Sequence, residues 1–152
     1  DQQISIIESQ LDSIVEHIDS PIFSIKGIGV YTACAILGEF GNIIDFDTPN
    51  QMVAFAGLDC SRNQSGQQDH RGKTVKRGSP HLRYNLLNVI RSVCLYNPVF
   101  KTFYDKKRII EKKPRRVSEI HTAKKLIRVI FALYHSLDEN GNYMKFNPEN
   151  LR

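Results

Sequence analysis

Residues 79–97 read SPHLRYNLLNVIRSVCLYN, and this stretch indicates the fold class of the chain. Its apolar residues recur every three or four positions, which is the spacing of one face of an α-helix. Ser79 is a preferred N-cap residue, Pro80 suits the first helical position, and the pattern ends near Asn97. The stretch therefore predicts an amphipathic helix whose buried face consists of Leu82, Leu86, Val89, Ile90, Val93 and Cys94.

The same helical spacing recurs on both sides of this stretch, divided by start and stop signals. A Thr48–Gln51 capping box and a glycine C-cap at Gly41 are examples of these signals. We expect an all-α fold of roughly six helices. They are one ending before Pro21, one leading up to Gly41, one between Thr48 and Gly57, the helix quoted above, one from Pro98 to Pro114, and a long one from Ser118 to Asn140–Gly141.

One segment breaks the helical pattern. Residues 58–78, LDCSRNQSGQQDHRGKTVKRG, are polar, basic and punctuated by glycine. They predict a long polar loop or a short irregular hairpin. Segments of this length inside a compact domain are usually functional or mobile.

The overall composition excludes several classes of protein. The chain has 152 residues, of which 41% are hydrophobic and 24% charged, as in one ordinary globular domain. No apolar run approaches the ~20 residues of a membrane span. The chain begins at Asp1 without a signal sequence, so we expect a fragment of a longer cytoplasmic protein. Cys34, Cys60 and Cys94 lack metal or disulfide spacing and fit a reducing compartment.

Charge is distributed very unevenly along the chain. Residues 1–60 contain one basic residue, Lys26, against nine acidic ones, whereas residues 61–125 contain 17 Lys and Arg against four acidic residues. A block this basic points to a polyanionic partner, most simply nucleic acid. The alternative is a solvated basic helix face, which is common in charged segments.

A first motif lies in residues 25–33, IKGIGVYTA. It resembles a helix-hairpin-helix DNA-binding motif, in which two glycines let the backbone approach a phosphate at a helix N-terminus. Lys26, Gly27, Gly29 and Thr32 are the candidate contacts. The alternative is a plain glycine turn between two core helices.

The first helix carries Ile4, Ile7, Leu11, Ile14 and Ile18 at alternating spacings of three and four. This is a coiled-coil-like seam, and we interpret residues 1–20 as the end of a helical linker. A helix packed on the domain explains the pattern equally well.

A second set of motifs spans the polar insert and its exit. TPNQMVAFAGL at 48–58, QSG at 64–66, GK at 72–73 and KRGSPHLR at 76–83 follow the hairpin motif in order. This order resembles the C-terminal domain of the IS110/IS116/IS902 family of insertion-sequence transposases. The resemblance is strongest over residues 20–110 and makes residues 21–152 the DNA-binding and serine-bearing domain. Cys60 departs from the pattern, since the family usually has proline there.

The resemblance implies a site-specific DNA recombinase that catalyses transposition. It implies a RuvC-like DEDD domain, N-terminal to this region, that holds Mg²⁺, a guide RNA, and a homo-oligomer acting in the cytoplasm near the nucleoid. The catalytic serine of the family matches Ser65, with Ser61 as the alternative. No cofactor or metal site is expected in this chain itself, which by itself should be inactive.

The chemistry of the insert agrees with this reading. A serine hydroxyl is a weak nucleophile, so attack on a phosphodiester needs surrounding positive charge. We expect a phosphate cradle formed by Arg62, Arg71, Lys73, Lys76, Arg77 and Arg83. Two other functions remain open: a non-catalytic helix-hairpin-helix DNA-binding module and a helical oligomerisation domain.

Overall fold

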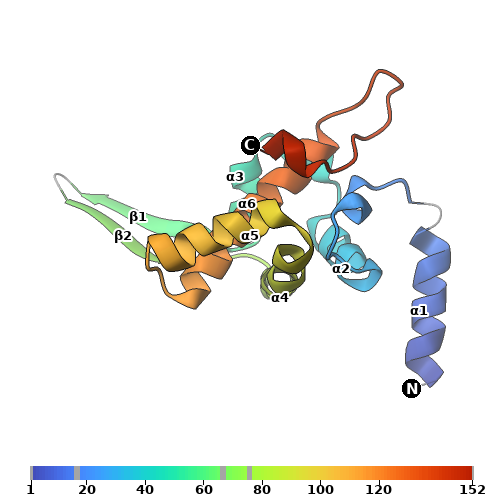
Figure 1. Cartoon of the computed structure of the whole chain (residues 1–152), viewed down its shortest axis with the longest axis horizontal. Coiled ribbons are helices and arrows are strands. Elements are labelled where there is room, and N and C mark those ends of the chain that lie inside the picture. Colours follow the sequence, from blue (N-terminus) through green and yellow to red (C-terminus); the bar gives the residue numbers. More distant parts are fainter. Residues whose placement is uncertain (1, 16–17, 66–67, 75–76, 152) are drawn as a thin grey trace.

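The computed structural model describes residues 2–15, 18–65, 68–74 and 77–151 (Figure 1). The described part contains six α-helices: α1 (Gln2–Val15), α2 (Val30–Phe40), α3 (Pro49–Phe55), α4 (Pro80–Tyr96), α5 (Pro98–Asp105) and α6 (Arg115–Tyr134). Short helical turns are η1 (Pro21–Ser24), η2 (Ile43–Asp45), η3 (Lys106–Ile110) and η4 (Pro148–Leu151). The expected all-α fold is confirmed, with one β-hairpin added: β1 (Cys60–Ser65) and β2 (Gln68–Thr74).

Helix α6 forms the centre of the helical body, where it contacts α3, α4 and α5. The apolar stripe predicted for this helix is buried, and Leu126, Ile127 and Ile130 have no exposed surface. Burying one such side chain contributes about 1.5–3 kcal/mol relative to leaving it exposed. Packing around α6 therefore supplies part of the apolar contact that stabilises the body.

Several predicted helix ends are confirmed by side-chain contacts. Thr48 and Gln51 form a capping box at the start of α3, and the Ser79 side chain accepts a hydrogen bond from the Leu82 N–H at the start of α4. Gly41 ends α2 with a φ of 67°. These contacts satisfy backbone groups that have no partner inside the helix.

The predicted limits of the last helix are wrong at both ends. The helix begins at Arg115 because the Pro114 carbonyl already accepts the helical hydrogen bond from the Ser118 N–H, at 3.0 Å. The buried Ser118 hydroxyl also donates to that carbonyl and caps nothing. At the other end the helix stops at Tyr134, and Asn140–Gly141 belongs to a separate turn closed by Asp138.

The polar insert forms the short hairpin and not the long loop. Its strands pair antiparallel from Cys60↔Thr74 to Ser65↔Gln68, with an irregularity between Cys60 and Arg62. The hairpin projects from the helical body at the end opposite α1 (Figure 1). Its sequence has no alternating apolar face of the kind that antiparallel sheets commonly bury.

Two glycines, Gly57 and Gly78, lie side by side where the chain leaves α3 for the hairpin and returns from it to α4, and we call this place the neck. Gly57 follows α3 with a φ of 63°, and Gly78 precedes α4 with a φ of 127°. A Cβ at Gly78 would lie 2.8 Å from the backbone nitrogen of Gly57, so the two chains touch backbone to backbone. The Ser79 N–H donates to the Phe55 carbonyl at 3.2 Å and fixes this contact.

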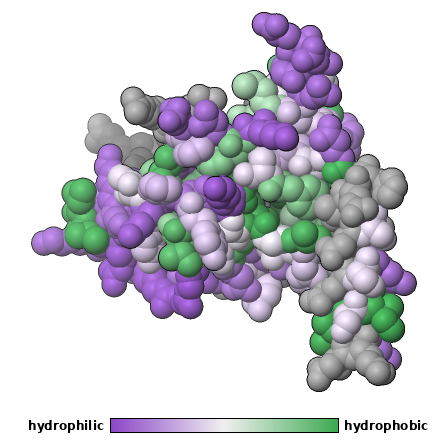
Figure 2. Space-filling view, turned by 45° about the vertical axis from the view of Figure 1, so that its right-hand side comes forward, coloured by the Kyte–Doolittle hydropathy of each residue, from purple (hydrophilic) through white to green (hydrophobic). Residues whose placement is uncertain are grey.

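Helix α1 lies at the far end of the molecule, beside α2 (Figure 1). Ile4, Ile6 and Ile7 are more than half exposed, and Figure 2 shows apolar side chains gathered on this protruding segment. The helix contacts α2, yet Ile4 and Ile7 of the predicted seam do not pack on the domain, so both interpretations of this helix stay open. In the described part of the chain, no helix is long and apolar enough to cross a membrane.

Candidate nucleic-acid interface

The two candidate serines occupy different positions on the hairpin. Ser65 ends β1 and pairs with Gln68, at the end of the ladder that is farther from the helical body. Ser61 lies near the neck, within the irregular step between Cys60 and Arg62. The hairpin thus carries Ser65 away from the body and keeps Ser61 close to it.

Three of the predicted basic residues share the hairpin with Ser65. Arg62 and Arg71 are register partners, and Lys73 precedes the Thr74 that pairs with Cys60. Like charges at directly opposite positions of paired strands disfavour the pairing. Lys76 lies outside the described residues.

The neck holds the remaining two predicted basic residues. Arg77 is exposed, whereas the Arg83 side chain lies against Gly57, where an added Cβ would come within 2.5 Å of its Nη1. That nitrogen is buried without a hydrogen-bond partner in the described structure. Nearby, the Ser79 hydroxyl donates to the Glu39 carboxylate at 2.5 Å and ties the neck to α2. The KRGSPHLR motif therefore has a clear structural role at the neck, and Arg77 is its accessible cation.

The glycine turn before α2 differs from the expected motif in two ways. A single turn of 3-10 helix, η1, precedes it in place of a full helix. Gly27 has a φ of 94°, and a Cβ there would lie 2.6 Å from the Ser92 carbonyl oxygen. The Asn97 side chain also donates to the Lys26 carbonyl. Gly27 is thus required for packing on α4.

Gly29, the second glycine, is accessible. It caps α2 with a φ of −75°, and a Cβ there would meet nothing within 4 Å. Lys26 is exposed and Thr32 is partly exposed on the same segment. The N-terminus of α2 therefore offers an open backbone at Gly29, one cation and one hydroxyl, while the partly exposed Gly27 is held against α4.

Ion pairs organise the basic connection between α5 and α6. Glu111 pairs with Lys107 at 2.5 Å and with Lys113 at 2.9 Å, and these two hydrogen-bonding partners, Lys107 first, lower the pKa of Glu111 to about 2. Burial, followed by the nearby charges of Lys113 and Lys107, lowers the pKa of His121 below its usual value. The carboxylate is therefore charged and the imidazole largely neutral near pH 7.

Sequence reasoning counted Arg91, Arg115 and Arg116 in the basic block but did not single them out. Arg115 and Arg116 form the first turn of α6, where the helix dipole disfavours cations. Both pair with Glu119, at 2.9 and 3.4 Å. The two adjacent arginines directly after Pro114 were the signal in the sequence that could have identified this region.

The donor set for a resident metal ion is missing from the described part of the chain. Within those residues, no three His, Cys, Asp or Glu side chains converge on one point. Asp59, which flanks the hairpin, lies 3.8 Å from the Lys124 ammonium of α6. The family resemblance implies Mg²⁺ on the RuvC-like domain and not on this chain, so this finding does not bear on that ion.

These features define a helical domain with a projecting polar hairpin and accessible cations at its neck and on α4 and α6. Residues 19–105 match the model of the Transposase IS116/IS110/IS902 family, and the chain belongs to this family. The match covers every element from η1 to the end of α5, including the glycine turn and the hairpin.

Known relatives agree with this assignment. The chain is 28% identical over 135 residues to the insertion element IS110 uncharacterized 43.6 kDa protein of Streptomyces coelicolor, covering 87% of this chain and 33% of that protein. It is 28% identical over 114 residues to a probable family 20 transposase of Pseudomonas aeruginosa, covering 74% and 34%. It is 27% identical over 137 residues to the transposase for insertion sequence element IS1111A of Coxiella burnetii, covering 88% and 38%. The chain thus spans about a third of the length of these relatives.

Proposed function

We propose that this chain is the DNA-binding, serine-bearing C-terminal domain of a DEDD-type transposase that catalyses DNA strand exchange. The observation that carries the proposal is the family match over residues 19–105, since it includes the projecting hairpin with Ser65. The 17 basic residues within residues 61–125 support binding to a polyanion. The activity belongs to the full-length enzyme, and this chain by itself binds DNA without cutting it.

In the proposed reaction, the Ser65 hydroxyl oxygen attacks a phosphodiester phosphorus. A serine–phosphate ester bond forms, the bond from phosphorus to the leaving strand oxygen breaks, and that oxygen takes up a proton. Ser61 is the alternative nucleophile. Cationic side chains of this chain neutralise charge on the attacked phosphate, namely Arg62, Arg71, Lys73, Lys76 and Arg77. Mg²⁺ held by the RuvC-like domain adds further charge neutralisation at that phosphate.

The partners proposed for this domain are DNA, a guide RNA, the RuvC-like domain and further copies of the enzyme, and the family resemblance supports them. DNA contacts the hairpin. It also contacts the N-terminus of α2, through Lys26, Gly29 and Thr32. The RuvC-like domain shares the active site with this domain, a guide RNA directs the enzyme, and the enzyme acts in the cytoplasm near the nucleoid. The exposed Ile4, Ile6 and Ile7 on α1 support a homo-oligomer, with α1 as the end of a helical linker.

Substitution of the two serines in the full-length enzyme tests this function. We expect Ser65→Ala to abolish strand exchange while DNA affinity changes less than twofold, because a hydroxyl contributes little to phosphate binding compared with the arginines. Ser61→Ala is the matched control on the same strand and keeps activity. Loss of exchange in Ser61→Ala alone assigns the reaction to Ser61. Full activity in both variants contradicts a serine nucleophile on this hairpin and favours a non-catalytic DNA-binding module.

A further inference from the structure

A groove lies between α4 and the start of α6, outside the hairpin. It consists of two adjoining cavities of about 360 and 570 Å³, which share Arg91, Arg115 and Glu119 in their walls. The smaller cavity is also bounded by α5. Volumes of this size are within the usual range of ligand pockets, about 300–1,000 Å³.

The larger cavity is basic and polar. Its wall contains Arg91, Arg115 and Arg116, against Glu119 as the acidic member, together with Asn88 and Ser92. The Arg115 and Arg116 side chains are 61% and 68% exposed, while Glu119 is 16% exposed beneath them. Glu119 holds both arginines in place, and their remaining N–H groups are free to face an anion.

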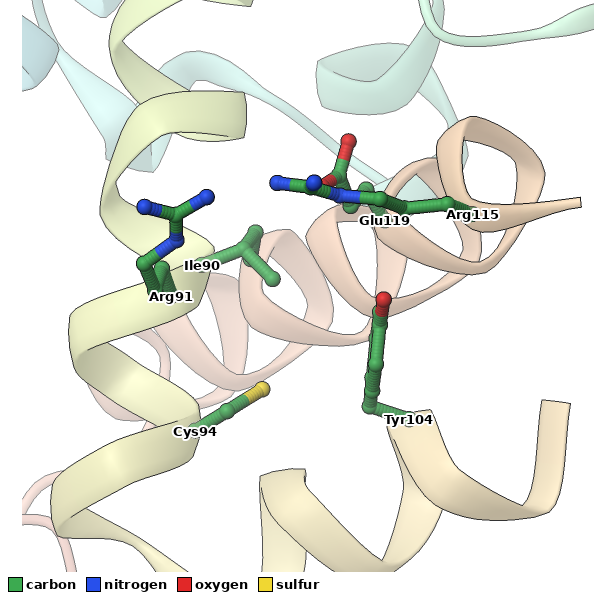
Figure 3. A pocket seen from close by; sticks show the side chains of 6 residues that line it. All are labelled: Ile90, Arg91, Cys94, Tyr104, Arg115 and Glu119. Carbon is green, nitrogen blue, oxygen red and sulfur yellow. The ribbon is translucent and has the colours of Figure 1, made fainter. Parts of the chain in front are cut away.

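The smaller cavity has an apolar floor. Ile90 and Cys94 of α4 face Tyr104 of α5, and Arg91 and Arg115 border the opening from opposite sides (Figure 3). Burial, and then the charge of Asp105, raises the pKa of Cys94 to about 11, so its thiol is uncharged near pH 7. A flat apolar group with polar edges suits this floor, with the arginines next to it.

The glycine turn packs against one wall of the groove. Ser92 lines the larger cavity, and its carbonyl oxygen is the atom against which Gly27 packs. Lys26 precedes Gly27 and is exposed. The segment that packs against this wall therefore carries a cation that a nucleic-acid strand can reach.

We propose that this groove binds a single-stranded nucleic-acid segment, with one unstacked base beside Tyr104 and its flanking phosphates on Arg91, Arg115 and Arg116. A base inside a duplex is stacked on both faces and does not enter such a cavity, whereas a single strand can present it. An aromatic side chain within a basic groove is the usual arrangement for binding single strands. This inference rests on the proposed function and adds a site separate from Ser65.

Binding of short oligonucleotides to this chain tests the groove, with fluorescence anisotropy as the measurement. We expect Tyr104→Leu to weaken binding of single strands roughly tenfold, the effect of losing one stacked base, and to change duplex affinity less than twofold. Tyr84→Leu is the matched control, because Tyr84 is 67% exposed on α4 and lies outside both cavities. If Tyr104→Leu loses more affinity for single-stranded RNA than for single-stranded DNA of the same sequence, RNA is the occupant of the groove. The reverse result identifies a DNA strand as the occupant.

Two further measurements keep the test independent of folding effects. Arg91→Ala should reduce the salt slope of binding by about 1, while Arg128→Ala, an exposed arginine of α6 outside the groove, should not. In the unaltered chain, an oligonucleotide carrying 5-iodouracil should photo-cross-link to the peptide that contains Tyr104.

Two results would overturn the proposal that the groove binds single strands. One is cross-linking confined to the peptides that contain Tyr84 or Tyr96. The other is unchanged affinity of the Tyr104→Leu variant for both single-stranded RNA and single-stranded DNA. Neither result contradicts the proposed function, because strand exchange that depends on Ser65 does not require Tyr104. Conversely, strand exchange that is independent of both serines overturns the proposed function. The proposal that the groove binds single strands is still supported in that case if Tyr104 cross-links to the oligonucleotide.

Discussion

Two glycines in the turn before α2 occupy different environments although they are two residues apart. Gly27 has a positive φ and touches the backbone of α4, while Gly29 has an ordinary φ and open space around it. From the sequence, both were assigned the same purpose, approach to a phosphate. The structure assigns packing on α4 to Gly27, whereas Gly29 is exposed and has open space around it.

Gly27→Ala is therefore expected to destabilise the fold by about 2–4 kcal/mol, from the positive φ and from the clash with the Ser92 carbonyl. Gly29→Ala, the matched control, should cost less than about 1 kcal/mol because its site is open and only the N-cap preference changes. Urea unfolding followed by circular dichroism measures both. Equal stability of the two variants would contradict the packing role of Gly27.

At the scale of elements, helix limits were predictable where a side chain caps the helix. Thr48, Gln51 and Ser79 gave correct starts because each forms the contact that its residue type favours. The limits of α6 were not predictable from such signals. Ser118 bonds back to Pro114 inside the helix, and Asn140–Gly141 forms a turn of its own.

The candidate site, like the helix limits, was predictable from the sequence only in part. The basic block and the polar hairpin insert were visible in the sequence, since both depend on composition. The groove was not visible, because Arg91 and Arg115 are far apart in the chain and meet only when α4 packs on α6. Tyr104 alone was indistinguishable from a core or rim aromatic residue.

Because the neck is closed by contacts of its own, we predict that the helical body folds without the hairpin. Replacing residues 60–74 with a short Gly-Ser linker should change the free energy of unfolding by less than about 1 kcal/mol, because the hairpin has no apolar face and Gly57 still meets Gly78. Ser79→Ala provides a reference for damage to the neck, with an expected cost of ~1 kcal/mol. Thermal unfolding of the three proteins measures this. Loss of helical structure in the shortened chain would show that the body depends on the hairpin.

For the whole molecule, the charge distribution separates two ends of the chain. Residues 1–60 are acidic, with Lys26 as their one basic residue, whereas the hairpin, α4, α5 and the start of α6 carry the basic block. The exposed apolar side chains of α1 lie at the end opposite the hairpin. Under the proposed function, one end joins protomers and the other contacts nucleic acid.

This distribution predicts that the chain binds duplex DNA with a strong dependence on salt and little dependence on sequence. If about six phosphates are engaged, the logarithm of the association constant should fall against that of salt concentration with a slope of roughly −5. A titration from low to moderate salt with two unrelated duplexes measures the slope. A flat response would contradict nucleic-acid binding and favour the oligomerisation domain.

The central claim is that Ser65, carried on the projecting hairpin, is the nucleophile of a transposase. The most direct test is mass spectrometry of the full-length enzyme trapped with its DNA and guide RNA, after nuclease digestion. We predict a phosphate adduct on the peptide that contains Ser65, with none on Ser61. An adduct on Ser61, or on no serine of the chain in a reaction that has exchanged strands, would contradict the claim.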